Sequence, residues 1–314
     1  MHRTKTFAIA LGLSAALSAH AQAADPESCK EVRFSDVGWT DITATTAAAS
    51  VITEALGYQP SVEILSVPVT YRSLASNDID VFLGNWMPTM EADIRPYLDD
   101  GTVETITTNL EGAKYTLAVP KYTFDAGLQN FSDIATFKDK LDGQIYGIEA
   151  GNDGNRLILD MIENDTFGLS GFELVESSEA GMLSAVSKAV GNKEDVVFLG
   201  WEPHPMNANI EMAYLAGGDD VFGPNYGGAT VHTNVRAGYT TECPNIGKLL
   251  ENLVFSLKME NEIMGAILDD GAEPKAAATA WLKANPDAIA PWLDGVTTLD
   301  GGDGMAAVKA ALGM

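Results

Sequence analysis

The sequence predicts an α/β protein built from two lobes. Segments with strand and helix signals alternate along its whole length, which is typical of layered α/β folds. The part that follows a predicted export signal is about 290 residues long, more than most single domains. In addition, three predicted strands are each followed by a glycine-containing turn and a tryptophan. The carboxyl edge of such strands is where open α/β sheets bind ligands.

The first 23 residues have the pattern of a secretory signal peptide. Arg3 and Lys5 precede a short apolar stretch over residues 7–13, and Ala21-Gln22-Ala23 provides a small-residue cleavage site. The stretch is too short to span a bilayer, which takes roughly 20 apolar residues. We expect cleavage after Ala23, with Ala21 as the alternative. Because no Cys stands at this point, we expect a free protein outside the cytoplasm.

The chain is strongly acidic, with 44 Asp and Glu against 19 Lys and Arg and a net charge of -25. Loss of the signal peptide removes two basic residues and no acidic one, so the exported form is more acidic still. A surface of this charge repels nucleic acid and anionic membranes and weakly favours cationic small molecules.

The chain has two cysteines, Cys29 and Cys243. In an oxidising compartment such a pair predicts one structural disulfide, which would tie the N-terminal segment to a distant part of the chain. The alternative is two buried, unpaired thiols. Neither residue lies in a recognisable nucleophile motif.

The first predicted unit alternates strands with one long helix that ends at Gly57. Its strands cover residues 32–37, 62–65 and 79–83, and its helix begins near residue 42. The second unit has predicted strands over 115–119, 144–149, 172–175 and 196–199 and helices over 132–141, 156–163 and 181–190. The remainder has strands over 210–215 and 230–235 and helices over 246–257, 260–268, 274–284 and 305–312.

This order indicates a chain that leaves one lobe near residue 115 and returns near residue 208. We therefore expect lobe I to comprise residues 24–114 and 209–314, and lobe II residues 115–208. Two crossings of this kind form a hinge.

The five tryptophans divide into two groups. Trp281 and Trp292 lie in helical, amphipathic sequence and are expected to be packing residues. Trp39, Trp86 and Trp201 each follow an apolar strand beside small or turn-forming residues. An aromatic residue repeated at strand ends of a two-lobed protein indicates contact with a ligand.

Three indole faces turned toward one point suit a quaternary ammonium group. Its methyl groups spread the positive charge and donate no strong hydrogen bond, and each good ring contact is worth about 0.5–2 kcal/mol. A primary ammonium would leave N–H groups unsatisfied there, at about 1–3 kcal/mol each.

Three segments resemble the glycine betaine/choline substrate-binding proteins of ABC importers, and the choline-binding proteins most closely. They are Val37-Gly38-Trp39-Thr40-Asp41, Ile79-Asp80-Val81-Phe82-Leu83-Gly84-Asn85-Trp86 and Phe198-Leu199-Gly200-Trp201-Glu202-Pro203-His204. The resemblance covers nearly all of the chain after residue 23. It implies a two-lobed type II periplasmic-binding protein fold with two hinge crossovers.

The same resemblance implies the ligand and its contacts. Trp39, Trp86 and Trp201 would form an aromatic box with Tyr115 as its fourth wall, while Asp41 and Asn152 would face the polar end of the ligand. The ligand would be choline or a related quaternary ammonium compound. The partner would be an ABC permease in the inner membrane, and the protein would be a periplasmic monomer without a cofactor or metal.

Each of these polar and aromatic residues also has a plain structural interpretation. Tyr115 fits an ordinary strand aromatic, Asp41 a helix cap or first-turn residue, and Asn152 a turn former. Asp41 in a cleft would bind an alcohol and a cation and repel a ligand carboxylate, which favours choline over glycine betaine. His204 fits a hinge or supporting residue and stays outside the expected ligand set.

Two other functions remain as alternatives. A binder of glycine betaine or proline betaine needs a cationic carboxylate pocket, and no Arg or Lys lies near the three tryptophans in sequence. Arg156 is the nearest cation to the Asn152 turn. An enzyme needs an activated nucleophile, a metal or a cofactor, and the chain has no G-x-S-x-G, H-E-x-x-H or P-loop motif. We therefore expect a binding protein rather than an enzyme.

Overall fold

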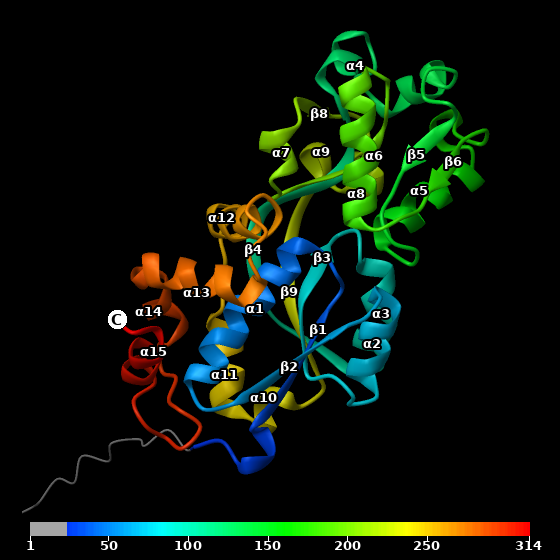
Figure 1. The fold of residues 1–314 in the computed structure, drawn as a ribbon. Coiled ribbons are helices and arrows are strands. Elements are labelled where there is room, and N and C mark those ends of the chain that lie inside the picture. Colours follow the sequence, from blue (N-terminus) through cyan, green and yellow to red (C-terminus); the bar gives the residue numbers. More distant parts are fainter. Residues whose placement is uncertain (1–23) are drawn as a thin grey trace, which may run out of the picture.

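A computed structural model describes residues 24–314, so the predicted signal peptide lies outside the described residues. The strands form one curled sheet in the order β2-β1-β3-β9-β4-β7-β5-β6, with β8 paired to β4. Figure 1 shows two lobes, each a part of this sheet covered by helices, joined by two strands that pass between them. The α/β fold predicted from the alternation of strand and helix signals is confirmed.

The first lobe contains the N-terminal strands and the long helix that follows the first strand. Its elements are β1 (Glu31–Asp36), α1 (Thr40–Ala55), β2 (Gln59–Ile64), α2 (Val67–Ala75), β3 (Val81–Met87) and α3 (Glu91–Asp99). β1 pairs in parallel with both β2 and β3, so the carboxyl ends of all three strands point toward the second lobe. Parallel strands with helical connections bring the residues that follow them to one edge of the sheet.

Two long strands join the lobes: β4 (Val103–Pro120) and β9 (Gly228–Arg236). The first part of β4 pairs antiparallel with β9, with three register shifts along the pair. Its last part pairs with β7 and β8 of the second lobe. One strand therefore carries side chains of both lobes past the space between them.

The second lobe is built from short strands and helices after β4. They are α4 (Lys121–Asp125), β5 (Gln144–Tyr146), α5 (Asp153–Glu163), β6 (Glu173–Val175), α6 (Glu179–Asn192), β7 (Phe198–Glu202), α7 (Met206–Asn209), β8 (Met212–Tyr214), α8 (Asp219–Phe222) and α9 (Pro224–Gly227). The predicted lobe boundary at residue 208 stays a prediction. β8 pairs with the end of β4, in the second lobe. We therefore propose that the chain returns to the first lobe later than residue 208, along β9.

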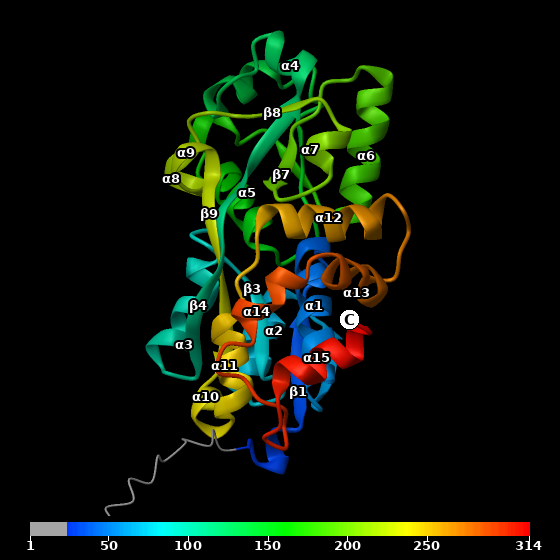
Figure 2. The ribbon, with the colours of Figure 1, turned by 90° about the vertical axis from the view of Figure 1, so that its left-hand side faces the viewer.

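The C-terminal quarter of the chain returns to the first lobe as helices. They are α10 (Tyr239–Glu242), α11 (Pro244–Asn252), α12 (Leu257–Leu268), α13 (Pro274–Ala284), α14 (Ile289–Trp292) and α15 (Gly304–Leu312). Figure 2 shows α12 lying across the boundary between the lobes, above α13 and α1. α12 and α13 both pack on α1, which is buried along most of its length.

Some predicted elements differ from the observed ones. The bounds of α13 agree with the prediction, whereas α2 and α3 were not predicted, and the helix expected over 132–141 is instead a 3₁₀ segment, Phe131–Phe137. Trp86 and Trp201 were expected just beyond their strands, but both lie within them. β3 continues because Trp86 pairs with Val231 of β9.

The N-terminal segment is fixed to the first lobe by a disulfide and by a cap. Cys29 and Cys243 are bridged, with a Cα–Cα separation of 5.7 Å, so the predicted pairing is confirmed. The Asp25 carboxylate accepts hydrogen bonds from the backbone N–H groups of Asn245 and Ile246, in the first turn of α11. A carboxylate at a helix N-terminus satisfies free N–H groups and interacts favourably with the helix dipole.

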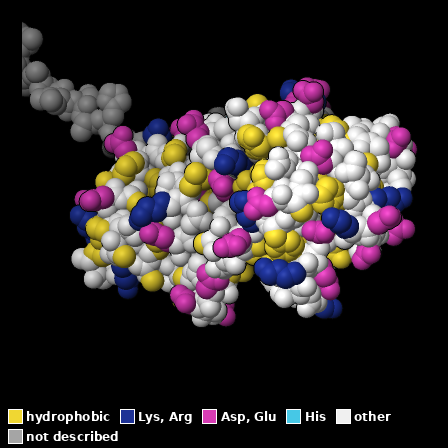
Figure 3. All heavy atoms as spheres, turned by 90° about the horizontal axis from the view of Figure 1, so that it is seen from above, with side chains coloured by type: hydrophobic (Ala, Val, Ile, Leu, Met, Phe, Trp, Pro, Cys, Tyr) yellow, Lys and Arg dark blue, Asp and Glu magenta, His cyan; other side chains and the backbone are white. Residues whose placement is uncertain are grey.

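On the face seen from above, acidic side chains lie between basic and apolar side chains and are not gathered in one patch (Figure 3). Within residues 24–314, no helix has the length and apolar character needed to cross a membrane.

Candidate ligand-binding site

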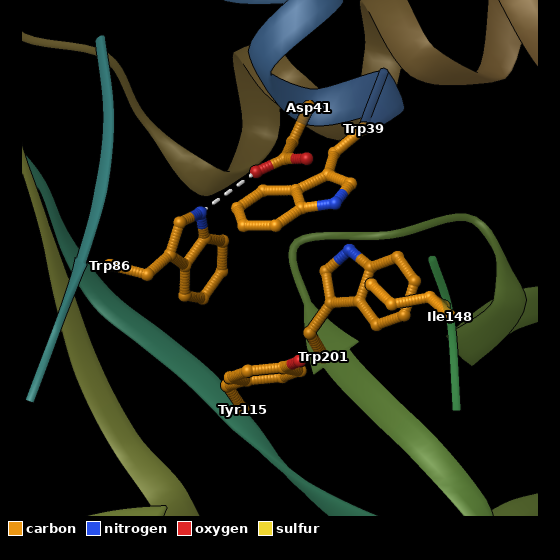
Figure 4. Close-up of a pocket in the computed structure, with 6 residues that line it drawn as sticks. All are labelled: Trp39, Asp41, Trp86, Tyr115, Ile148 and Trp201. Atoms are coloured by element: carbon orange, nitrogen blue, oxygen red, sulfur yellow. Dashed lines mark hydrogen bonds between the residues drawn. The ribbon is translucent and has the colours of Figure 1, made fainter. Parts of the chain in front are cut away.

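A small cavity lies between the two lobes and is lined mainly by aromatic side chains (Figure 4). Its walls are Trp39, Asp41, Trp86, Tyr115, Ile148 and Trp201. The first lobe supplies three of these residues, from the start of α1 and from β3. The second lobe supplies Ile148 and Trp201, and Tyr115 comes from the crossing strand β4.

The aromatic rings stand at steep angles to one another around this space. The Tyr115 ring centroid lies 6.0 Å from that of Trp86, with 61° between the planes, and 6.3 Å from that of Trp201, with 83°. Strand pairing sets this arrangement, because Tyr115 and Trp201 are register partners across β4 and β7. Figure 4 shows the rings converging on a common space instead of stacking on each other.

Asp41 is the acidic group of the cavity wall. It lies in the first turn of α1 and is only 1% exposed. Its Oδ2 accepts a hydrogen bond of 3.1 Å from Trp86 Nε1, while its Oδ1 is buried without a partner. Burial, with a smaller contribution from the charge of Glu179, raises the pKa of Asp41 to about 8. An unpartnered carboxylate oxygen at a cavity wall is suited to a ligand that brings a positive charge or a hydroxyl donor.

A second carboxylate near Asp41 belongs to α12. Glu260 is buried, and burial followed by the nearby charge of Asp41 raises the pKa of its side chain well above the ordinary value. Two carboxyl groups so placed disfavour each other's ionised forms. The environment of the cavity is therefore one in which an added cation is electrostatically favoured.

The indole N–H of Trp39 reaches across to the second lobe. Its Nε1 donates to Glu149 Oε1 at 2.7 Å, although the two residues are 110 positions apart. Burial raises the pKa of Glu149, and the Trp39 hydrogen bond partly offsets this. The contact fixes the indole ring at the point where the two lobes meet.

Tyr115 is held by the start of α5. Its hydroxyl donates to Asn152 Oδ1 at 3.0 Å, and the same oxygen accepts from Asn155 N at 3.0 Å, so Asn152 caps α5. A Cβ at position 154 would lie 2.0 Å from the Tyr115 hydroxyl, so glycine is required there. Asn152 therefore lies behind Tyr115 and not in the cavity wall.

Arg156 faces away from the cavity and joins the lobes. One of its guanidinium nitrogens donates to Thr89 O at 2.9 Å and to Asp93 Oδ2 at 2.8 Å. Asp153, also at the start of α5, is buried, and burial raises the pKa of its carboxyl to about 7. The cation nearest the Asn152 turn is thus already paired with a carboxylate of the first lobe.

The structure brings together five of the six residues expected around a ligand, namely Trp39, Asp41, Trp86, Tyr115 and Trp201. Their contact with a ligand stays a prediction. His204 lies outside the cavity wall, with its ring centroid 4.9 Å from that of Trp201. Ile148 was not identified from sequence, although it lies two residues after the end of β5. Trp292 is buried among apolar residues, whereas Trp281 is only partly buried.

Residues 30–284 match the family described as the substrate-binding domain of the ABC-type glycine betaine transport system. The chain belongs to this family. Members of the family bind substrates for transport. The match includes every residue of the cavity wall and both strands that join the lobes.

Solved structures of relatives have the same fold. An ABC-transporter choline-binding protein in complex with choline is 70% identical, covering 92% of this chain and all of the other, with a TM-score of 0.91. A choline-binding protein in an unliganded, semi-closed conformation has the same identity and coverage and a TM-score of 0.85. Lactococcal OpuAC in its closed-liganded form with glycine betaine is 25% identical, covering 84% of this chain and 99% of the other, with a TM-score of 0.76. The fold is that of the periplasmic binding proteins, as predicted.

Proposed function

We propose that this protein is the substrate-binding component of an ABC importer and that its ligand is choline. The observation that carries this proposal is the composition of the cavity. Among the described residues, its wall has four aromatic side chains and one carboxylate and no Lys or Arg. The 70% identical relative that was solved with choline supports the same ligand.

A trimethylammonium group fits such a cavity for a physical reason. It carries a permanent charge, needs no hydrogen-bond acceptor and is attracted by aromatic faces, at about 0.5–2 kcal/mol for each ring. Trp39, Trp86, Tyr115 and Trp201 would surround it. The apolar walls exclude water from the cavity. The attraction between the cation and Asp41 would therefore be stronger, because charges interact more strongly in a medium of low dielectric constant.

The hydroxyl end of choline requires an acceptor or a donor. Asp41 Oδ1 is buried without a partner and would accept the hydroxyl hydrogen. Asn152 lies behind Tyr115 and would support this end of the site through the Tyr115 hydroxyl, which donates to its Oδ1 at 3.0 Å. We assign Asp41 directly, and Asn152 through Tyr115, to the polar end of the ligand.

Glycine betaine is the alternative ligand, because the family name and lactococcal OpuAC both refer to it. Its carboxylate would meet the ionised form of Asp41, which is the form that a cation favours, in a site from which water is excluded, and like charges at short distance are costly there. Arg156 does not relieve this repulsion, since Asp93 and Thr89 already bind its guanidinium. Choline is therefore the ligand favoured by the charges around the cavity.

In the proposed cycle the protein acts in the periplasm as a monomer, captures choline between its lobes, and delivers it to a permease in the inner membrane. The lobes close by bending along β4 and β9. Contacts that join the lobes, such as Trp39 with Glu149, belong to the closed form. No chemical change of the ligand is involved.

Calorimetric titration with choline, acetylcholine, glycine betaine and ectoine tests the proposal. Choline is expected to bind most tightly, with a dissociation constant near the micromolar range. This corresponds to a binding free energy of about 8 kcal/mol in favour of the complex. Tighter binding of glycine betaine would contradict the proposed selectivity. Recovery of the ligand unchanged after long incubation would separate a binding protein from an enzyme.

A further inference from the structure

Helix α1 begins without a cap of its own. Its N-cap residue is Trp39, whose side chain makes no capping hydrogen bond. The first backbone N–H groups of a helix have no partner within the helix, and they carry the positive end of its dipole. A side-chain acceptor from elsewhere is needed when such an end is buried, and Thr40 here is buried.

The second lobe supplies that acceptor. Glu179 Oε2 accepts a hydrogen bond of 2.9 Å from the Thr40 backbone N–H, and Glu179 Oε1 accepts one from Thr40 Oγ1. Glu179 is the first residue of α6, 139 positions away, and is 5% exposed. The carboxylate of one lobe thus caps a helix of the other.

His204 holds this carboxylate in place. Its Nδ1 accepts a hydrogen bond of 3.0 Å from Met206 N, which puts the ring proton of the neutral tautomer on Nε2. Nε2 lies 3.2 Å from Glu179 Oε1 and donates to it. Glu179 therefore accepts from three donors, two in the first lobe and one in the second. Its carboxyl oxygens thus serve as acceptors for both lobes.

The capped residue stands between two residues of the cavity wall, since Trp39 and Asp41 flank Thr40 in sequence. We propose that Glu179 is a positioning residue that caps α1 from the opposite lobe, holds Trp39 and Asp41 in their binding geometry and stabilises the closed form. Glu179 itself does not line the cavity. The inference rests on the proposed function only for the identity of the ligand.

Choline release from variants tests the role of the cap. Radiolabelled choline is bound and chased with unlabelled choline. Glu179→Ala is expected to speed release by about tenfold with little change in association. Glu179→Gln is expected to have a smaller effect, because its amide oxygen keeps one acceptor. Thr40→Val removes one donor without changing any charge or disturbing His204, and release is expected to be about threefold faster.

Glu163→Gln is the matched control. It removes the same charge from an exposed position of the second lobe, at the end of α5. Release from this variant is expected to match the wild type. Unchanged choline release from both Thr40→Val and Glu179→Gln would overturn the proposal. If Glu163→Gln changed release as much as Glu179→Gln, the effect of Glu179→Gln would be due to net charge and not to the cap.

A second measurement does not require choline. Spin labels on cysteines introduced at the exposed positions Arg72 and Asp160, one on each lobe, report the distance between the lobes. Both native cysteines are bridged and do not react with the label. Without ligand, Glu179→Ala and Thr40→Val are expected to shift the distances toward longer values, and an unchanged distribution would contradict the cap. If wild-type protein binds no choline, the proposed function fails while this measurement still tests the cap.

Discussion

The indole N–H of Trp86 donates to the carboxylate of Asp41 across 45 positions of sequence, at 3.1 Å. The bond uses one oxygen of Asp41 and leaves the other buried and unpartnered at the cavity wall. It also turns the edge of the ring toward the carboxylate, so that the face remains available to the cavity (Figure 4). In the proposed function the two residues form one unit, in which the ring face and the carboxylate would attract the same cation.

Removal of a ring from the box is expected to weaken binding strongly while the fold is retained. For Trp86→Ala or Trp201→Ala we expect the choline dissociation constant to rise at least about tenfold, the effect of losing one good cation–π contact and its apolar surface. Calorimetry measures the affinity, and circular dichroism checks the fold. Trp281→Ala, whose ring lies outside the cavity wall, is the control with unchanged affinity.

Neutralising Asp41 is expected to change selectivity. Asp41→Asn keeps the size of the side chain but removes the charge that attracts choline and repels a ligand carboxylate. We expect weaker choline binding and a narrower gap between choline and glycine betaine. A wider gap in parallel titrations would mean that Asp41 acts as a helix-end residue and not as the selector.

Choline binding is expected to depend on pH through Asp41. The charge of choline does not titrate, whereas the pKa of Asp41 in the empty site is raised to about 8. Below that pH the carboxyl is protonated and attracts the cation less. Affinity should therefore fall as the pH is lowered, by at most about tenfold per pH unit for one linked proton. Titrations between about pH 6 and pH 9 measure this, and Asp41→Asn should give a flatter profile.

The same raised pKa predicts that Asp41 destabilises the empty protein. In the unfolded chain the carboxyl loses its proton near its ordinary pKa, whereas the folded protein retains it up to about pH 8. The contribution of this group to stability therefore falls as the pH rises through that interval. At neutral pH, Asp41→Asn without ligand is expected to melt about 2–4 °C higher, the shift produced by about 1 kcal/mol. A lower melting temperature would contradict this.

Loss of the disulfide is expected to lower stability with little effect on ligand binding. The bridge closes a segment of 214 residues, and removal of a native disulfide typically costs about 2–5 kcal/mol. For Cys29→Ser with Cys243→Ser we expect a lower melting temperature by differential scanning calorimetry. The choline affinity should be retained, because neither cysteine lines the cavity. A large loss of affinity in folded protein would show that the N-terminal anchor acts on the site.

The three tryptophans around the cavity were predictable because each has a local signal, whereas Tyr115 was placed there by the resemblance. An apolar strand next to Trp39, Trp86 or Trp201 places the ring near one edge of the sheet, whatever the exact end of the strand. The hydrogen bonds from Thr40 to Glu179 have no such signal. The sequence around Glu179 does not show that its side chain will meet the start of α1 in the other lobe. Asn152 was placed near the ligand by resemblance, but its capping of α5 decides where its side chain lies.

The missed helices α2 and α3 have a different cause. Both are nine residues long, and α3 contains Pro96, which normally argues against a helix. Packing on the sheet stabilises them where local preference does not. Ile148 was missed because it looks like any apolar residue of a strand, and only the position of β5 beside β7 turns it toward the rings.

The gathering of three of the five indoles in one cavity gives the protein a built-in optical reporter. In the proposed function, a cation between these rings would change the polarity around three of the five indoles at once. Occupancy is then expected to be measurable by intrinsic fluorescence without any attached dye, and the protein would serve as a starting point for a sensor of the proposed ligand.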